Sequence, residues 1–148
     1  IKEDILVGGE EAGGMGFKNY IPERDGSLAG LLLLEMMVYR KKDILHILND
    51  MEKQFGRYYY LRLDLKLKRP ISSGELLKFK EIGKVLNKEV VKVKDFDGVK
   101  LICQDASWLM LRASGTEPLV RVYAESKSLN RSKEIIKFGE SLVGKYAL

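Results

Sequence analysis

Residues 58–68 alternate between apolar and polar side chains, and this period of two constrains the fold more than any other feature of the sequence. Each odd position from Tyr59 to Leu67 carries tyrosine or leucine, whereas four of the even positions are charged. Successive side chains of a strand point to opposite faces. The stretch therefore predicts a β-strand with one face on a hydrophobic core and the other in water.

Downstream of this strand, the sequence predicts more strands of the same sheet. Four are expected, at residues 89–94, 98–103, 107–111 and 119–124. Asp97 and Gly98 separate two of them, and an Asp-Gly pair between apolar runs is a hairpin turn signal. We therefore expect neighbouring strands here to be antiparallel.

Two helices are expected beside these strands. Ser72 and Glu75 have the spacing of a capping box and open a helix that runs to about residue 86. Its predicted inward positions are Leu76, Phe79, Ile82 and Leu86. A last helix covers about residues 130–146. The order strand, helix, several short strands and helix predicts an α+β fold, in which a mostly antiparallel sheet is flanked by helices.

The N-terminal part of the chain follows a different pattern. Ile5–Val7 is a short apolar strand candidate that leads into a glycine-rich loop. Residues 27–39 predict a helix that is apolar nearly all round, and such a helix requires burial on several sides. Residues 43–55 predict a second helix with Asp43 as its N-cap. We therefore expect a boundary between residues 40 and 56.

The composition excludes several classes of protein. The chain of 148 residues has the size of a single domain, and its net charge of +5 suits a protein that handles anions without indicating a nucleic-acid binder. Cys103 is the only cysteine, which excludes a disulfide scaffold and indicates a reducing compartment. Neither a membrane span nor a signal peptide is predicted, so we expect a cytoplasmic protein that does not bind membranes.

A first candidate site is the segment Arg112–Pro118, which is followed by Arg121. Ser114, Gly115 and Thr116 predict a tight turn between two strands, and backbone N–H groups and hydroxyls in such a turn can converge on an anion. The arginines on either side can close on phosphate oxygens as forks. The alternative is a plain hairpin turn with two solvated arginines.

A second candidate site is the glycine-rich loop Gly9–Gly14, which carries two glutamates. Carboxylates on a loop accept hydrogen bonds from sugar hydroxyls, and they can instead ligate a metal ion. The alternative is an acidic turn on the protein surface.

Together, the two segments resemble the substrate loops of the α-D-phosphohexomutase family, the phosphoglucomutases and phosphomannomutases. In that family a Gly-Glu-x-Ser-Gly loop of the third domain holds the sugar hydroxyls. An Arg-x-Ser-Gly/Asn-Thr-Glu-Pro loop of the fourth domain holds the substrate's phosphate. The stretch Ile21–Gly26 is also similar to the family's segment after the sugar loop, and the resemblance extends over nearly the whole chain.

The resemblance implies a division of the chain into three parts. Residues 1–40 would be the tail end of the third domain, an α/β domain whose sheet lies mostly upstream. Residues 41–56 would be a connecting helix or linker. Residues 57–148 would be the fourth domain, with a sheet and helices similar to the TATA-binding-protein fold.

The resemblance also implies roles for individual residues. Glu10 and Ala12 stand at sugar-binding positions, although Ala12 replaces the usual serine and loses its hydrogen bond. Gly14 stands where some members have a histidine. Arg24 stands, with a one-residue length difference, where some members have a lysine acid/base, but arginine is a poor proton donor because its pKa lies above ~12. The phosphate-binding positions are Arg112, Ser114, Gly115, Thr116 and Arg121.

Two motifs of the family do not occur in this sequence. They are the loop with the phosphorylated serine nucleophile and the Asp-Gly-Asp-x-Asp loop that holds Mg²⁺. We therefore expect a substrate-binding C-terminal part of an enzyme that interconverts hexose 1-phosphate and hexose 6-phosphate through a phosphoserine. The chain alone is expected to be inactive and to hold no metal, and its partners would be a hexose phosphate and upstream domains. The identity of the hexose stays open.

The second function that we consider is a non-enzymatic nucleic-acid module. Aromatic side chains among cations can stack bases and contact phosphates. Such side chains stand on the polar face of the alternating strand, namely Tyr58, Tyr60, Arg62, Lys66 and Lys68. An amphipathic strand with a solvated face explains the same pattern, and we favour that explanation.

Overall fold

The computed structural model describes residues 4–10, 13–115 and 117–144. The chain divides into two compact units, Ile1–Phe55 and Gly56–Leu148. The division falls after the second helix of the chain, at the end of the stretch 41–56.

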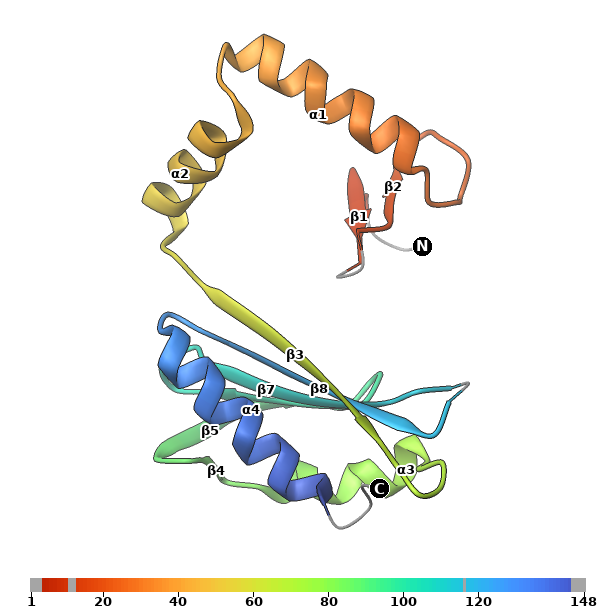
Figure 1. Cartoon of the computed structure of the whole chain (residues 1–148), viewed down its shortest axis with the longest axis vertical. Helices are drawn as coiled ribbons and strands as arrows, with labels where there is room; N and C mark the ends of the chain where they lie inside the picture. Colours follow the sequence, from red (N-terminus) through yellow and green to blue (C-terminus); the bar gives the residue numbers. More distant parts are fainter. Residues whose placement is uncertain (1–3, 11–12, 116, 145–148) are drawn as a thin grey trace. The chain divides into compact units, whose positions relative to one another are not determined.

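The first unit begins with a small β-hairpin and continues into two helices (Figure 1). Strand β1 (Val7–Gly9) pairs antiparallel with β2 (Met15–Phe17), with Val7 opposite Phe17. The strand expected at Ile5–Val7 was thus placed two residues too early. The register of the hairpin explains the difference. Gly9 pairs with Met15 and Gly8 with Gly16, so the first two glycines of the loop belong to strand β1.

Both helices of the first unit have the side-chain caps that fit their sequences. In α1 (Gly26–Arg40), Asp25 accepts a hydrogen bond from the Leu28 amide at 2.9 Å. In α2 (Ile44–Phe55), the predicted cap Asp43 accepts from the His46 amide at 2.9 Å. Both helix predictions are confirmed. Within the described chain, α1 buries only Ala29, and its remaining apolar side chains stay partly or largely exposed.

The second unit is built on a six-stranded sheet in which each pair of neighbours is antiparallel. The strand order is β3-β8-β7-β6-β5-β4. The strands are β3 (Tyr59–Lys66), β4 (Lys84–Val85), β5 (Lys88–Lys94), β6 (Val99–Cys103), β7 (Trp108–Ala113) and β8 (Leu119–Ser126). The alternating stretch is therefore a strand, as predicted, and Gly98 stands in the β5–β6 turn with φ of +106°.

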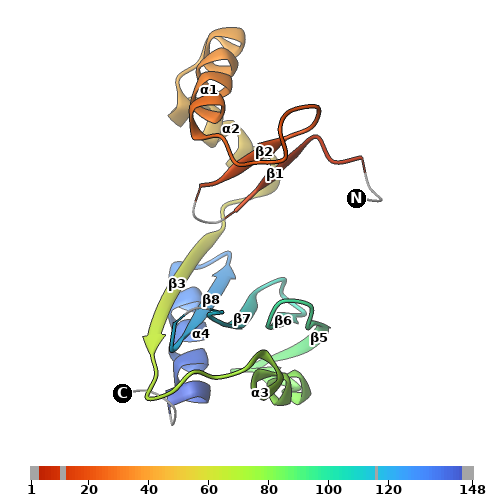
Figure 2. The ribbon, with the colours of Figure 1, turned by 90° about the vertical axis from the view of Figure 1, so that its right-hand side faces the viewer.

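Helices cover one face of this sheet. The long helix α4 (Leu129–Val143) packs on β3, β8 and β7, as Figure 2 shows, while α3 (Ser73–Leu76) packs on β7. The short 3₁₀-helix η1 (Leu77–Glu81) packs on β6. This arrangement confirms the predicted α+β fold with an antiparallel sheet and flanking helices.

The helix predicted to run from Ser72 to about residue 86 is much shorter in the structure. The capping box at its start is present, but the helix tightens to 3₁₀ geometry after Leu76 and ends at Glu81. Ile82 is already extended, and Gly83, which disfavours a helix, follows it. Leu86 does not point inward: it has φ of +56° and is 39% exposed.

The hydrophobic core lies between the sheet and its helices. The alternation of β3, β7 and β8 places one set of side chains against α4, while the other set stands on the open face. The largest fully buried members of the core are Leu76, Leu101, Leu109, Leu111 and Ile135. The charged residues of the predicted phosphate site lie on the opposite, open face of the sheet.

Candidate functional site

The β7–β8 hairpin carries the Arg112–Pro118 segment. The Ser114 amide donates to Leu119 O at 3.0 Å, and the Leu119 amide donates to Glu117 O at 2.8 Å. The Glu117 amide donates to the Ser114 hydroxyl oxygen at 3.3 Å. The Ser114 amide therefore closes the hairpin instead of pointing to an anion. Thr116, one of the predicted phosphate-binding residues, lies outside the described residues, and Gly115 is exposed at the turn.

Arg112 and Arg121 stand directly opposite each other, at the ends of β7 and β8 next to this turn. Strand geometry places directly opposed side chains on the same face, with Cβ atoms ~4.5–5.5 Å apart. The alternation of both strands assigns that face to the side away from α4. The structure thus brings together the two arginines that the sequence singled out.

The Arg112 side chain is held from two directions. Its Nε lies 2.9 Å from an Asp97 carboxylate oxygen, and Tyr123, which is buried, shares a hydrogen bond with it. Burial lowers the pKa of Arg112, but the Tyr123 hydrogen bond and the Asp97 charge together raise it above its ordinary value. Arg112 is 35% exposed, so its guanidinium is anchored and still reaches the surface.

Arg121 is partly buried and incompletely satisfied. Its Nε is buried and has no hydrogen-bond partner among the described residues. Across the other neighbouring strand it faces Asp64, but both carboxylate oxygens of Asp64 accept hydrogen bonds from Arg62, at 2.7 Å each. The Arg62 fork holds the pKa of the Asp64 carboxyl below its usual range, and the Arg121 charge adds to this effect.

Three arginines and two carboxylates are therefore linked, by strand pairing or direct contact, across β3, β7, β8 and the β5–β6 turn. They are Arg62, Arg112, Arg121, Asp64 and Asp97. Arginine presents several N–H donors in one plane, which matches the oxygens of phosphate or carboxylate. A buried Nε without a partner is costly unless a ligand or water satisfies it. The arrangement can bind an anion, and it contains no group placed to break a bond.

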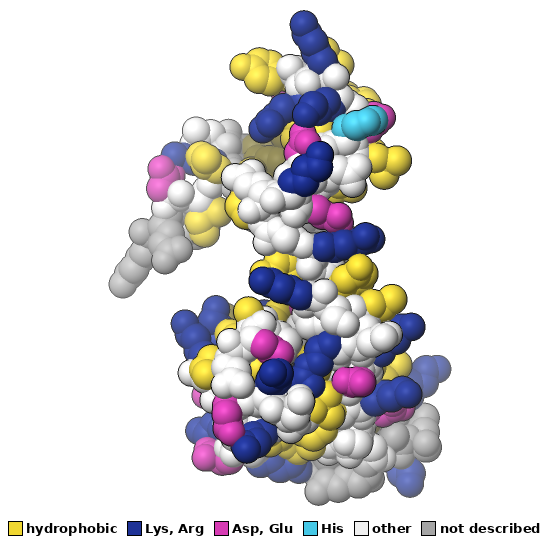
Figure 3. All heavy atoms as spheres, turned by 90° about the vertical axis from the view of Figure 1, so that its left-hand side faces the viewer, with side chains coloured by type: hydrophobic (Ala, Val, Ile, Leu, Met, Phe, Trp, Pro, Cys, Tyr) yellow, Lys and Arg dark blue, Asp and Glu magenta, His cyan; other side chains and the backbone are white. Residues whose placement is uncertain are grey.

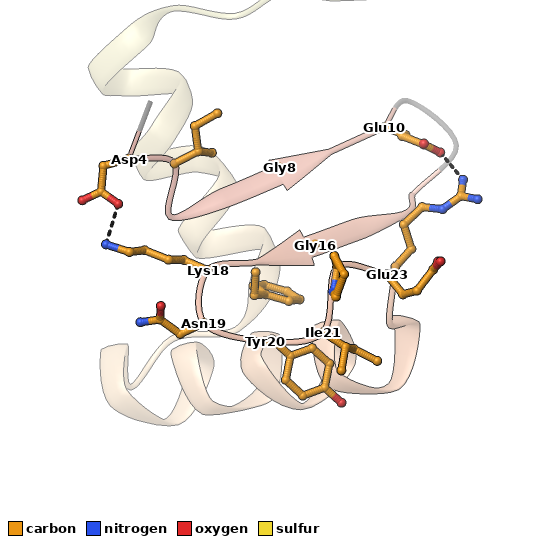
Figure 4. Close-up of a pocket in the computed structure, with 13 residues that line it drawn as sticks. Asp4, Gly8, Glu10, Gly16, Lys18, Asn19, Tyr20, Ile21 and Glu23 are labelled. Carbon is orange, nitrogen blue, oxygen red and sulfur yellow. Dashed lines mark hydrogen bonds and ion pairs between the residues drawn. The ribbon is translucent and has the colours of Figure 1, made fainter. Parts of the chain in front are cut away.

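The glycine-rich loop of the first unit forms a tight turn on the β1–β2 hairpin. The Glu10 amide donates to Gly14 O at 2.8 Å, and the Gly13 amide donates to Glu10 O at 3.0 Å. The Glu10 carboxylate lies 2.5 Å from the Arg24 guanidinium, which is the dashed contact at Glu10 in Figure 4. Ala12 lies outside the described residues.

Gly14 leaves room for this ion pair. A Cβ added at Gly14 would lie 2.5 Å from Cδ of Arg24 and 3.2 Å from a carboxylate oxygen of Glu10. A side chain at position 14 would thus displace Arg24. Glycine at position 14 and arginine at position 24 are therefore structurally coupled.

A cavity of about 670 Å³ opens beside the same hairpin. Figure 4 shows side chains from the segment before β1, from Glu10 after it and from the loop that follows β2 around this cavity. Its lining combines backbone of Gly8 and Gly16 with polar groups such as Glu10 and Arg24. Carboxylate and guanidinium groups beside exposed backbone can serve a ligand rich in hydroxyl groups.

No metal site is formed by the residues that the structure describes. Across 4–10, 13–115 and 117–144, no three His, Cys, Asp or Glu side chains group around a common point. The resemblance assigns the Mg²⁺ to an Asp-rich loop that does not occur in this sequence, so no step below passes through a metal. Also within the described ranges, no helix has the length and apolarity needed to cross a membrane.

Two side chains of the nucleic-acid alternative, Arg62 and Tyr60, are engaged with their neighbours. Arg62 is bound to Asp64 and lies 5.8 Å above the Tyr123 ring, and the Tyr60 ring lies 6.3 Å from that of Trp108. On the face shown in Figure 3, lysine and arginine side chains are spread out with acidic side chains between them. This pattern does not favour a nucleic-acid surface.

Sequence reasoning missed Asp97 and Tyr123 as partners of Arg112. The Asp97–Gly98 pair was interpreted only as a turn, which it is. Only the register of the folded β6–β7 hairpin, which pairs Val99 with Leu111, places Gly98 opposite Arg112. The partnership of Arg24 with Glu10 likewise has no signal in the spacing.

Comparison with known families covers both units. Residues 65–138 match the family model described as the C-terminal domain of phosphoglucomutase/phosphomannomutase. Residues 1–55 match the model described as the alpha/beta/alpha domain III of the same enzymes.

Curated relatives carry names from the same group of enzymes. The chain is 29% identical over 143 residues to a phosphoglucomutase/phosphomannomutase of Thermococcus kodakarensis, covering 97% of this chain and 29% of that protein. It is 33% identical over 141 residues to a phosphoglucosamine mutase of Methanococcus aeolicus, covering 95% of this chain and 30% of that protein. A phosphoglucosamine/phosphogalactosamine mutase of Sulfurisphaera tokodaii is 31% identical over 134 residues, covering 90% of this chain and 28% of that protein.

A solved structure supports the fold. The crystal structure of a phosphoglucomutase/phosphomannomutase family protein from Burkholderia thailandensis superposes with a TM-score of 0.65 and 19% identity. The match covers 95% of this chain and 28% of the other. The chain thus spans less than a third of the length of these relatives.

Proposed function

Since the chain belongs to the phosphoglucomutase/phosphomannomutase family, we propose that it is the substrate-binding C-terminal part of a longer phosphohexomutase. Its second unit binds the phosphate of a hexose phosphate, and its first unit binds sugar hydroxyls. The observation that carries the proposal is the pair of opposed arginines beside the Ser114 turn, one of which has a buried Nε that no described residue satisfies.

The role of the phosphate site follows from the chemistry of the reaction. In the longer enzyme, a phosphoserine gives its phosphoryl group to a hexose phosphate, and the bisphosphorylated sugar then turns over. Its other phosphate returns to the serine. Arg112 and Arg121 hold the phosphate that is not being transferred, in both orientations of the sugar. Their contribution is positioning and charge neutralisation.

The role of the sugar loop follows from its carboxylate. A carboxylate can accept several hydrogen bonds, so Glu10 can keep its contact with Arg24 and still accept from sugar hydroxyls. Arg24 acts here as the partner of Glu10 rather than as an acid/base. Ala12 contributes no side-chain hydrogen bond to the sugar. We propose a hexose phosphate as the ligand without choosing among glucose, mannose and glucosamine.

The proposal is tested by titrating the chain with glucose 1-phosphate and inorganic phosphate in a calorimeter. Arg112→Ala removes a charge-assisted, partly desolvated contact, which costs roughly 1.5–3 kcal/mol. Affinity should therefore fall about tenfold to hundredfold. Arg112→Lys should restore only part of the affinity, because a point charge cannot replace a planar fork.

Lys137→Ala is the control, because it removes an exposed positive charge from α4, which covers the other face of the sheet. It should leave the affinity nearly unchanged. Phosphorus NMR of the same samples should show no conversion of glucose 1-phosphate, since the chain contains no phosphoserine loop. Equal affinity of the wild type and Arg112→Ala would contradict the proposal.

A further inference from the structure

We propose that Asp97, in the turn between β5 and β6, is a positioning residue for the phosphate site. Its carboxylate sets the direction in which the Arg112 guanidinium points. The inference rests on the proposed function, because it concerns how Arg112 meets its anion. It adds the β5–β6 turn to a site otherwise built from the β7–β8 hairpin.

The turn that carries Asp97 is fixed against β7. Gly98 has φ of +106°, a conformation that favours glycine. A Cβ added to it would lie 2.3 Å from Leu111 O and 3.1 Å from Cα of Arg112. The backbone of the turn therefore rests on the backbone that bears the arginine. Asp97 is presented to Arg112 by this close approach.

The contact between the two side chains leaves the arginine able to bind an anion. Asp97 engages Nε at 2.9 Å, and the hydrogen bond with Tyr123 fixes the group from the sheet side. A guanidinium has five N–H donors in one plane, so two such contacts do not exhaust it. Because both partners fix the position of the guanidinium, its remaining N–H donors keep one orientation at the end of β7.

Two effects of opposite sign act on phosphate affinity. The charge of Asp97 weakens the attraction of the site for an anion, whereas its hold on Arg112 reduces the conformational freedom that the arginine loses on binding. Arginine has a long side chain with much rotamer freedom, and Arg112 reaches the surface. We expect the effect on conformational freedom to be the larger one.

Substitutions at one position separate the two effects. Asp97→Ala removes both the charge and the acceptor, whereas Asp97→Asn removes the charge but keeps an oxygen that can accept from Nε–H. In the full 148-residue chain, Asp97→Ala should weaken binding of inorganic phosphate and of glucose 1-phosphate by about threefold to tenfold. Asp97→Asn should retain clearly more affinity than Asp97→Ala.

Asp95→Ala is the matched control. It removes the same charge from the same turn, but Asp97 is the carboxylate paired with Arg112. The phosphate affinity of Asp95→Ala should equal that of the wild type or slightly exceed it. The proposal is overturned if Asp97→Ala binds phosphate as tightly as Asp95→Ala. An Asp97→Asn variant that binds no better than Asp97→Ala would also overturn it, because the oxygen would then not hold the guanidinium.

A second measurement reports on the contact itself. The NMR signal of the Arg112 Nε–H should move, and its exchange with water should accelerate, in Asp97→Ala but much less in Asp97→Asn. An Nε–H signal that is the same in wild type and Asp97→Ala contradicts the contact. This readout remains valid even if the alanine variant melts at a lower temperature.

The two proposals fail in different ways. A wild-type chain that binds neither ligand would refute the proposed function, and the role of Asp97 with it. If the wild-type chain binds phosphate, Arg112→Ala loses this binding and Asp97→Ala binds as the wild type does, only the role of Asp97 is refuted.

Discussion

Arg112 and Arg121 face each other across β7 and β8, and directly opposed like charges destabilise a sheet by ~0.2–1 kcal/mol. The carboxylate of Asp97 offsets part of the repulsion at Arg112, and that of Asp64 does so from the strand beside Arg121. An anion bound between the arginines would remove the rest. The opposed pair thus has a cost in the free protein that a bound phosphate relieves.

Gly139 is a second residue whose identity is fixed by its surroundings. It lies on the face of α4 that meets the sheet, and an added Cβ would lie 2.5 Å from Cγ1 of Val122 and 2.7 Å from Cδ1 of Leu109. Gly139→Ala should lower the free energy of unfolding by about 1–3 kcal/mol, because overpacking outweighs the better helix propensity of alanine. Urea unfolding followed by circular dichroism measures the change.

The control for this prediction is Gly30→Ala in α1. It makes the same substitution inside a helix, but apart from the backbone of α1 itself no atom of the described residues lies within 4 Å of the added Cβ. This variant should be as stable as the wild type or slightly more stable. A Gly139→Ala variant with unchanged or raised stability would show that α4 does not approach the sheet as closely as described.

At the scale of elements, α3 depends on its capping box. The Ser72 hydroxyl oxygen accepts from the Glu75 amide at 3.1 Å, and the Glu75 carboxylate accepts from the Ser72 amide at 2.9 Å. The hydrogen bonds from Arg69, followed by that from the Ser72 amide, lower the pKa of Glu75 from 4.5 to about 2. The start of the helix is therefore sensitive to acid.

The sign of the pH dependence follows from the lowered pKa of Glu75. Its contribution to stability is complete above pH 4.5, declines as the pH falls, and is lost below about pH 2. Carbon-detected NMR should give a titration midpoint for the Glu75 carboxyl well below 4.5, and Arg69→Ala should raise it. A wild-type midpoint near 4.5 would mean that the capping box and the Arg69 contact do not form in solution.

At the scale of the whole molecule, much of the fold could be predicted because its signals are local. Alternation in β3, the Asp97–Gly98 turn, and the capping residues Asp43 and Ser72 each act within a few positions. The end of the helix after Ser72 could not be predicted in the same way. Leu86 fits the spacing of an apolar helix face, and only the pairing of β4 with β5 turns it outward.

The candidate site was predictable in part for the same reason. Arg112 and Arg121 flank a recognisable turn, so the sequence shows that they lie close together. The partners Asp97 and Tyr123 depend on the register of two hairpins and on which face each side chain takes. Such relations involve strands that are distant in the sequence, and no local pattern of residue types encodes them.

The central claim is that the Arg112–Arg121 pair binds the phosphate of the substrate. The most direct test is NMR titration of the ¹⁵N-labelled chain with glucose 1-phosphate, which locates the binding surface residue by residue. We predict that amide shifts concentrate at the end of β7, the start of β8 and the β5–β6 turn, and that Arg112→Ala abolishes them. Shifts centred on Tyr59–Lys66 that persist unchanged in Arg112→Ala would contradict the claim.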